Sequence, residues 1–169
     1  METAVLGGGC FWCTEAAFEE LDGVENVVSG YAGGSRENPT YREVCTGETG
    51  HAEVIRIEYD ENVVSYADLL EFLFRIHDPT TKDRQGPDIG SQYRSIILYE
   101  NEEQWKTAEN FLEQKRSEHE KEIVTELKKL EKFYRAEEKH QDYFKKNPKD
   151  AYCTLHATPK VEKAREFRK

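Results

Sequence analysis

Positive charge is in short supply in this sequence. The chain has 24 Lys and Arg residues against 34 Asp and Glu, a net charge of −10 with neutral histidines. Proteins that bind nucleic acids neutralise phosphates with basic patches. We therefore do not expect a nucleic-acid partner.

Long apolar runs are also missing. No stretch offers the roughly 20 apolar residues that a membrane-spanning helix needs. The opening METAVLGGG is too short for a secretory signal and has no Lys or Arg. We expect a cytoplasmic protein with no membrane partner. Repeats, low-complexity tracts and linkers are absent as well, so residues 1–169 are expected to form a single domain. We also expect a monomer.

Cysteines are few and unevenly spaced, at positions 10, 13, 45 and 153. In a cytosolic chain of this size they are more often reactive or metal-binding than a disulfide framework. A four-thiolate zinc site usually draws on two close pairs, and Cys10-x-x-Cys13 is the single close pair here. Zinc is therefore a minor interpretation, and we expect no metal.

Aromatic residues supply the core material that the low apolar fraction of 37% leaves wanting, with eight Phe, nine Tyr and two Trp. Periodicity predicts a helix from Ser65 that ends before Pro79, and inward Trp105, Ala108 and Leu112 on another. The full set predicts strands at 3–6, 24–31, 53–59, 96–99 and 123–127, and further helices at 14–21, 101–119 and 136–146. This alternation indicates a two-layer α/β sandwich around a mixed, largely antiparallel sheet of ferredoxin-like type, with an irregular C-terminal segment.

Three glycines lead from the first strand into Cys10, where a helix begins: GGGCFWCTEAAF, residues 7–18. A helix N-terminus lowers a thiol's pKa, and glycines leave room for a substrate. An isolated cysteine is more often a small buried hydrophobe, but the glycine run and the helix start together favour a reactive thiol. Phe11 fits the apolar face of the helix and Trp12 does not, so Trp12 is the better candidate for the wall of an apolar slot.

Glu53 lies on the apolar face of the strand EVIRIEY, together with Ile55 and Ile57. Burial there would raise its pKa and make it a proton donor near neutral pH. The alternative is a strand-end glutamate that reaches solvent, and the sequence leaves both open.

Five motifs occur in one order along the chain: GCFWCTE at 9–15, GYAGG at 30–34, NPTYREVCTGETGHAE at 38–53, DIGSQYRS at 88–95 and KHQDYF at 139–144. In this the sequence resembles the type A peptide methionine sulfoxide reductases over nearly its whole length. The resemblance implies a two-layer α/β fold and reduction of the S epimer of methionine sulfoxide, free or in proteins. It implies no cofactor.

The resemblance also implies roles for individual residues. Cys10 corresponds to the nucleophile and Glu53 to the acid, and Tyr41 and Tyr93 correspond to hydrogen-bond donors to the sulfoxide oxygen. In the binding pocket, Phe11 and Trp12 would hold the S-methyl group, Asp88 an ordered water or the substrate main chain, and His140 would lie at the rim.

After oxygen transfer Cys10 would be a sulfenic acid, which a second thiol converts to a disulfide that thioredoxin can open. Cys153 is favoured for this second thiol, because family members keep a recycling cysteine in the C-terminal segment. Cys13 is the alternative at helical spacing, Cys45 is expected to be structural, and direct reduction by an external small thiol is a third route. The competing function is a thioredoxin-like thiol-disulfide oxidoreductase that uses Cys10 and Cys13; a cysteine hydrolase is disfavoured because His51 and His140 stand in no protease motif.

Overall fold

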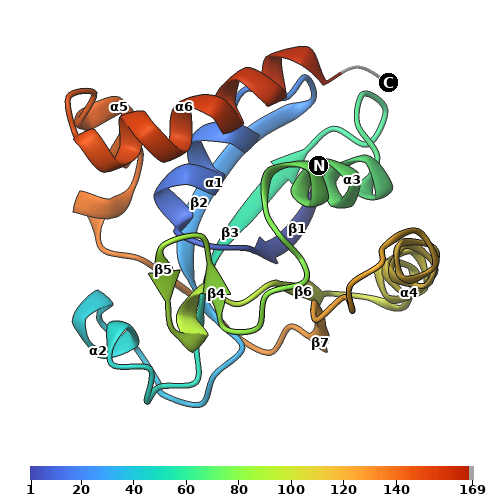
Figure 1. The fold of residues 1–169 in the computed structure, drawn as a ribbon, viewed down its shortest axis with the longest axis horizontal. Helices are drawn as coiled ribbons and strands as arrows, with labels where there is room; N and C mark the ends of the chain where they lie inside the picture. The colour runs from blue at the N-terminus through green and yellow to red at the C-terminus, as the bar shows by residue number, and fades with distance from the viewer. Residues whose placement is uncertain (168–169) are drawn as a thin grey trace.

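A six-stranded sheet forms the centre of the molecule (Figure 1). The computed structural model describes residues 1–167. The strand order is β7-β6-β1-β3-β2-β8, and every neighbouring pair is antiparallel except β6 and β7, which are parallel. The strands are β1 (Glu2–Gly7), β2 (Val24–Ala32), β3 (Ala52–Tyr59), β6 (Ile96–Tyr99), β7 (Glu126–Lys129) and β8 (Phe133–Arg135).

The longer helices are α1 (Phe11–Phe18), α3 (Tyr66–Ile76), α4 (Glu102–Glu118) and α6 (Ala151–Glu166). The larger apolar cluster joins strand residues such as Ile55 and Ile57 to Phe18 of α1 and Leu70 of α3. Helix α6 lies along α1 on the side away from the sheet (Figure 1). The N-terminus of α1 is therefore held between β3 and α6.

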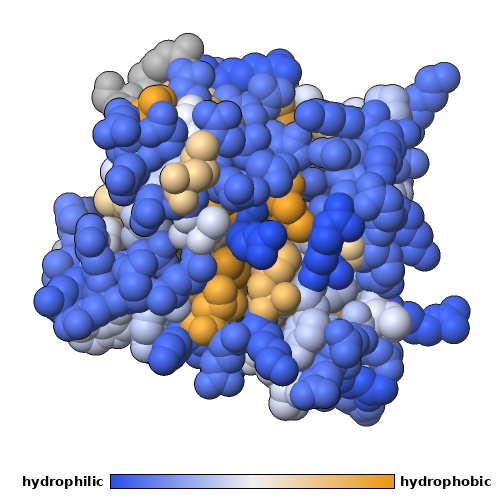
Figure 2. Space-filling view, turned by 180° about the vertical axis from the view of Figure 1, so that it is seen from behind, coloured by the Kyte–Doolittle hydropathy of each residue, from blue (hydrophilic) through white to orange (hydrophobic). Residues whose placement is uncertain are grey.

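A smaller apolar cluster occupies the other face of the sheet, where Val54 and Leu98 pack under Leu130 and Phe133. Seen from behind, apolar side chains gather in a strip near the centre and polar side chains surround them (Figure 2). Because both faces carry apolar clusters, the first half of β3 is buried on both sides, unlike a strand with one solvated face.

Local signals in the sequence set most of these boundaries. Ser65 accepts the Asp68 N–H and Asp68 accepts the Ser65 N–H, which is the predicted capping box at the start of α3. Asn101 caps α4 with a single bond, in which its side-chain oxygen accepts the Gln104 N–H. The strands predicted at 3–6, 24–31, 53–59 and 96–99 are confirmed.

The C-terminal segment is helical, so the prediction of an irregular segment was wrong. The Asp150 carboxylate caps α6 by accepting the Cys153 N–H, and Cys153, Ala157 and Val161 turn one face of the helix inward. Three small or medium side chains at this spacing give a low hydrophobic periodicity, which hid the helix. Packing against α1 stabilises it instead.

Three smaller predictions also need correction. Trp105 is 40% exposed, although Ala108 and Leu112 of the same helix are buried as expected. The last predicted strand starts later, at Glu126. The helix predicted at 136–146 is divided, because Asp142 adopts a left-handed conformation with φ of 53°.

Short elements fill the loops that lead to the sheet edge. They are α2 (Tyr41–Cys45), β4 (Arg84–Gln85), β5 (Asp88–Ile89), a 3₁₀ turn at Ser91–Tyr93, a second at Glu138–His140, and α5 (Tyr143–Lys146). Across residues 1–167, none of the helices combines the length and the apolar character required to cross a membrane.

Candidate active site

Cys10 stands at the N-cap of α1, as the glycine run predicted. Gly9 before it has φ of +89°, a conformation that disfavours any residue with a Cβ. The Gly9 N–H donates to the Tyr93 carbonyl at 3.2 Å, so the turn is hydrogen-bonded to the loop that contains Tyr93. The thiol is thereby fixed at a helix start with little of its surface exposed.

Glu53 reaches the same helix start from β3. Its Oε1 accepts the Phe11 N–H at 3.1 Å, one of the first-turn N–H groups that a helix leaves unpaired. Within residues 1–167 its second oxygen, Oε2, has no hydrogen-bond partner. The side chain is 1% exposed, so of the two alternatives left by the sequence the buried one is correct.

Burial raises the pKa of Glu53 to about 8, although the Phe11 N–H favours the carboxylate. The carboxyl group is therefore largely protonated at neutral pH. In that state Oε1 still accepts from Phe11, and Oε2 can carry a proton to donate. A buried acid with one free oxygen beside a thiol is arranged for proton transfer.

The thiols of Cys10 and Cys13 are hydrogen-bonded to each other. Burial, this hydrogen bond and the charge of Glu53 raise the pKa of Cys10. The prediction that the helix start lowers the pKa of Cys10 is therefore wrong for the free protein. The hydrogen bond from Cys10 and the charge of Lys160 instead lower the pKa of Cys13, the cysteine one turn into the helix.

Aromatic rings surround the helix start. Phe11 is fully buried and packs against Tyr31 and Tyr41, with ring centroids 5.6 and 6.1 Å away. Trp12 is half-buried and stacks on Tyr143 at 3.8 Å with an interplanar angle of 10°. Phe11 is thus core to the site, and Trp12 forms one of its walls.

Tyr41 and Tyr93 approach Cys10 and Glu53 from different loops. Tyr41 begins α2, and its ring lies 6.2 Å from that of Trp12. Tyr93 ends a 3₁₀ turn and packs against the cluster that contains Cys10. Burial, followed by the charge of Glu53, raises the pKa of both hydroxyls, so both are kept as hydrogen-bond donors.

His140 lies behind the aromatic rings, so its expected place at the rim is wrong. It is 4% exposed, and its Nδ1 accepts the Trp12 Nε1–H at 3.1 Å. Its ring also packs on Tyr41 at 4.3 Å. Burial lowers its pKa, which keeps it neutral and able to accept from Trp12. The side chain fixes the orientation of the Trp12 wall.

Cys10 and Cys13 line a cleft of about 770 Å³ between the end of α3 and α6. Asp88 of β5 also lines it and accepts a hydrogen bond from the Tyr152 hydroxyl. The cleft is hydrophilic at its outer end, where Lys160 and Lys163 project from α6. The thiol pair is therefore reached from one continuous surface opening.

The two remaining cysteines lie apart from Cys10. Cys153 is fully buried on α6, and burial together with the charge of Cys13 raises its pKa to about 12. Cys45 is exposed on α2, where its thiol meets the Tyr41 hydroxyl. The predicted preference for Cys153 over Cys13 thus finds no support in these contacts, because Cys13 is the thiol that is hydrogen-bonded to Cys10.

The chain as a whole matches one known protein family. Residues 2–169 match the family model of peptide methionine sulfoxide reductase. The chain belongs to this family.

Relatives and solved structures agree with the family match. A peptide methionine sulfoxide reductase MsrA from Natronomonas pharaonis is 63% identical over 166 residues, covering 97% of this chain and 93% of that protein. The reduced form of Mxr1 from Saccharomyces cerevisiae is similar with a TM-score of 0.86 and 36% identity, over 92% of this chain and 90% of that one. Methionine sulfoxide reductase A of Corynebacterium diphtheriae has a TM-score of 0.78 and 37% identity, over 87% and 75%.

Three residues of this reductase-family site escaped the sequence analysis. Glu137 accepts the Tyr31 hydroxyl and the Tyr41 N–H, both at 2.9 Å, and so anchors α2 under the aromatic rings. Tyr143 and Tyr152 complete the wall beside Trp12 and Asp88. Tyr143 was within a quoted motif, whereas Glu137 stands among other charged residues and gave no signal.

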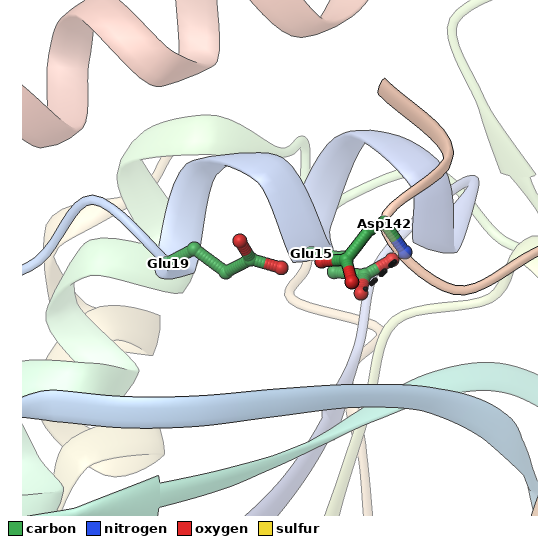
Figure 3. A group of neighbouring side chains, drawn as sticks. All are labelled: Glu15, Glu19 and Asp142. Carbon is green, nitrogen blue, oxygen red and sulfur yellow. Dashed lines mark hydrogen bonds between the residues drawn. The ribbon is translucent and has the colours of Figure 1, made fainter. Parts of the chain in front are cut away.

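A second buried carboxyl group in this member of the family lies outside the site. Glu15 of α1 accepts the Ser29 hydroxyl and the Asp142 N–H, both at 3.0 Å, and Glu19 lies one turn along the helix (Figure 3). Lys145 neutralises Glu19 at 2.7 Å. Burial raises the pKa of Glu15 to about 8. The group links α1 to the loop that precedes α5.

We expect Glu15→Gln to flatten the pH dependence of stability. Because the folded-state pKa is raised, the folded protein binds more protons than the unfolded chain between about pH 4.5 and 8, and stability falls as pH rises through that window. The amide can keep both hydrogen bonds if the Ser29 hydroxyl accepts. Urea unfolding at pH 5.5 and 8 measures this fall in the free energy of unfolding. In the variant the fall should be smaller by up to about 1.4 kcal/mol per pH unit. The exposed Glu25→Gln serves as the control, and equal slopes in all three proteins would contradict the assignment.

Proposed function

We propose that this chain reduces the S epimer of methionine sulfoxide, free or in proteins, to methionine. The observation that carries this proposal is the pairing of Cys10 with the free Oε2 of a protonated Glu53 at one helix start. A sulfoxide is a weak electrophile until its oxygen receives a proton. A nucleophilic thiol and a neutral acid on the same small site are the two groups that this reaction needs.

In the proposed first step Cys10 attacks as the thiolate, after its proton has passed to solvent. A bond forms from Cys10 Sγ to the substrate sulfur while Glu53 donates its proton to the substrate oxygen. In the collapse the oxygen moves with its proton to Cys10: the Sγ–O bond forms, and the substrate S–O bond and the bond between Sγ and the substrate sulfur break, which releases methionine and leaves Cys10 as a sulfenic acid. The substrate sulfur gains two electrons and Cys10 loses two, and solvent returns a proton to Glu53.

The surrounding side chains are proposed to bind and polarise the substrate. Tyr41 and Tyr93 stabilise the charge that develops on the sulfoxide oxygen, because both are held as neutral donors. Trp12, with Phe11 beneath it, forms the slot for the S-methyl group. In the same proposal Asp88 holds a water or the substrate main chain, and His140 contributes by orienting Trp12.

A reductant is proposed to complete the cycle by opening a disulfide on Cys10. Mxr1 from Saccharomyces cerevisiae has been solved in complex with Trx2, and that chain is similar to this one with a TM-score of 0.61 and 27% identity, over 84% of each. We propose thioredoxin as the partner here, with a small thiol as the second candidate. The second thiol that forms this disulfide is Cys153 or Cys13.

We propose one domain over residues 1–169, the last two of which lie outside the described residues, and a cytoplasmic monomer; four free thiols suit a reducing compartment. We also propose the ferredoxin-like description for the strands β6, β1, β3 and β2. Their order and antiparallel pairing support it.

The function is tested with the two epimers of a methionine sulfoxide peptide and dithiothreitol as reductant. We expect turnover of the S epimer and no measurable turnover of the R epimer, because the slot at Trp12 fixes which face of sulfur meets Cys10. Methionine is quantified by chromatography. Insulin-disulfide reduction, measured in parallel, tests the competing thioredoxin-like function of Cys10 and Cys13. Insulin reduction without turnover of the S epimer would overturn the proposal in favour of that alternative.

A further inference from the structure

We propose that Cys13 is the resolving thiol of this reductase and that Lys160 of α6 is the positioning residue that stabilises it as the attacking thiolate. This inference rests on the proposed function, since it concerns the step after methionine has left. It assigns the second thiol to Cys13 and gives a role to a lysine that no motif singled out.

Contact with Cys10 is the first support. The thiols of Cys10 and Cys13 are hydrogen-bonded, and both pack with Ala157 of α6 in one buried cluster. The Cys13 N–H also donates to the Cys10 carbonyl at 3.2 Å, which fixes the first turn of α1. Because both cysteines belong to the start of α1, with Cys10 as its N-cap, their sulfur atoms can approach each other without any movement of one helix relative to another.

The position of Lys160 is the second support. Lys160 follows Ala157 by one helical turn and lines the same cleft as Cys10 and Cys13. Among residues 1–167 no hydrogen bond or ion pair is formed by its ammonium group, unlike that of Lys163, which donates to the Arg75 carbonyl at 3.1 Å. The Lys160 charge is thus available to the thiol pair, and it lowers the pKa of Cys13.

Opposing charges face Cys13 from other elements, so the cation has a specific task. Asp88 and Asp150 both raise the pKa of Cys13 and act against Lys160. The further titratable groups that interact with this thiol are Cys10 at the N-cap of α1, Glu53 of β3, and Tyr152 and Cys153 of α6. The hydrogen bond from Cys10 and the charge of Lys160 outweigh the acids and the burial. Removal of Lys160 leaves the hydrogen bond from Cys10 to oppose the two acids without the cation.

Cys153 meets none of these conditions. It is fully buried, lies outside the cleft, and has its pKa raised to about 12 by burial and by the charge of Cys13. At neutral pH such a thiol is almost wholly protonated and is a poor nucleophile. Its N–H is also engaged with the Asp150 carboxylate that caps α6.

In the proposed resolving step, the Cys13 thiolate attacks Sγ of the Cys10 sulfenic acid. The S–S bond forms and the S–O bond of the sulfenic acid breaks. The oxygen leaves with its hydrogen and takes one more proton from Glu53, so that water is released. Cys13 sulfur is oxidised by one electron and Cys10 sulfur is reduced by one.

Single-turnover experiments with the reduced full-length protein and no external reductant test this step. Methionine release reports the first step, and loss of a second thiol together with disulfide mapping by mass spectrometry reports the resolving step. We expect one equivalent of methionine and a Cys10–Cys13 disulfide from the unaltered protein. If methionine is not released the proposed function fails, whereas release without a Cys10–Cys13 disulfide overturns this inference alone.

The Lys160→Met variant is expected to close the disulfide about three- to tenfold more slowly at pH 7, because fewer Cys13 thiols are ionised while each thiolate is somewhat more nucleophilic. Its closure rate plotted against pH should shift to higher pH, and Lys160→Arg should restore the original profile. Lys163→Met is the matched control, a lysine of the same cleft three residues away. A profile unchanged in Lys160→Met overturns the role of Lys160. A Cys10–Cys153 disulfide formed at the normal rate in Cys13→Ser overturns the role of Cys13.

Discussion

Glu53→Gln is expected to slow methionine release from the S epimer by about 10²- to 10⁴-fold, the range that a positioned general acid contributes. The amide can still accept the Phe11 N–H, so the helix start should keep its geometry. It has no proton to give to the sulfoxide oxygen. Single-turnover release, measured at saturating peptide, isolates this chemical step from recycling.

The same experiment has a pH dependence with a defined sign. The donor form of Glu53 is the protonated one, and its pKa is about 8. Because Cys10 must ionise to attack and its own pKa is raised, the release rate of the unaltered protein should rise with pH and level off near pH 8, where Glu53 begins to lose its proton. The residual rate of Glu53→Gln should keep rising above pH 8, since it depends on Cys10 ionisation alone. Glu58→Gln is the matched control, because Glu58 lies on the same strand but outside the site. Its carboxylate accepts a hydrogen bond of 3.0 Å from the Asn26 side chain. A Glu53→Gln protein as fast as that control would exclude Glu53 as the proton donor.

Cys10→Ser is expected to abolish methionine release. A serine hydroxyl at this position does not ionise, and serine has no sulfur atom that could take up the oxygen as a sulfenic acid. Serine preserves the N-cap of α1, for which it is a favoured residue, so the fold should persist. Release is measured in the single-turnover assay, and circular dichroism checks the fold.

The control for this variant is Cys45→Ser, which removes an exposed thiol on α2 and leaves the Cys10–Cys13 pair intact. Its methionine release should match that of the unaltered protein. If Cys10→Ser retained release in a single turnover, the nucleophile would be another thiol, and the contact between Cys10 and Glu53 would need a different explanation.

The local parts of the fold were predictable because short-range forces set them. Ser65 and Asn101 mark helix starts through their own hydrogen bonds, and the alternation in EVIRIEY follows from the pleat of a strand. The helix that begins at Cys10 follows from the glycines before it. These features depend on neighbours in the sequence, so the sequence reveals them.

The state of each titratable group was not predictable, because burial and distant charges control it. The helix start alone would lower the pKa of Cys10, but burial beneath α6 and the approach of Glu53 raise it. His140 was expected at a rim and is instead held under Trp12, because a loop 128 residues further along the chain folds back onto α1. The helix α6 was missed for the same reason, since its stability comes from packing on α1.

The sequence itself therefore determined the order of the motifs and the character of Cys10, Glu53 and the aromatic residues, which suffices to identify the family and to propose the first chemical step. Which thiol touches Cys10, which oxygen of Glu53 is free and which lysine faces Cys13 were decided by the tertiary structure alone. The physical reason is that a residue type records what chemistry a side chain can perform. Its pKa and its partners arise from packing between segments that lie far apart in the chain.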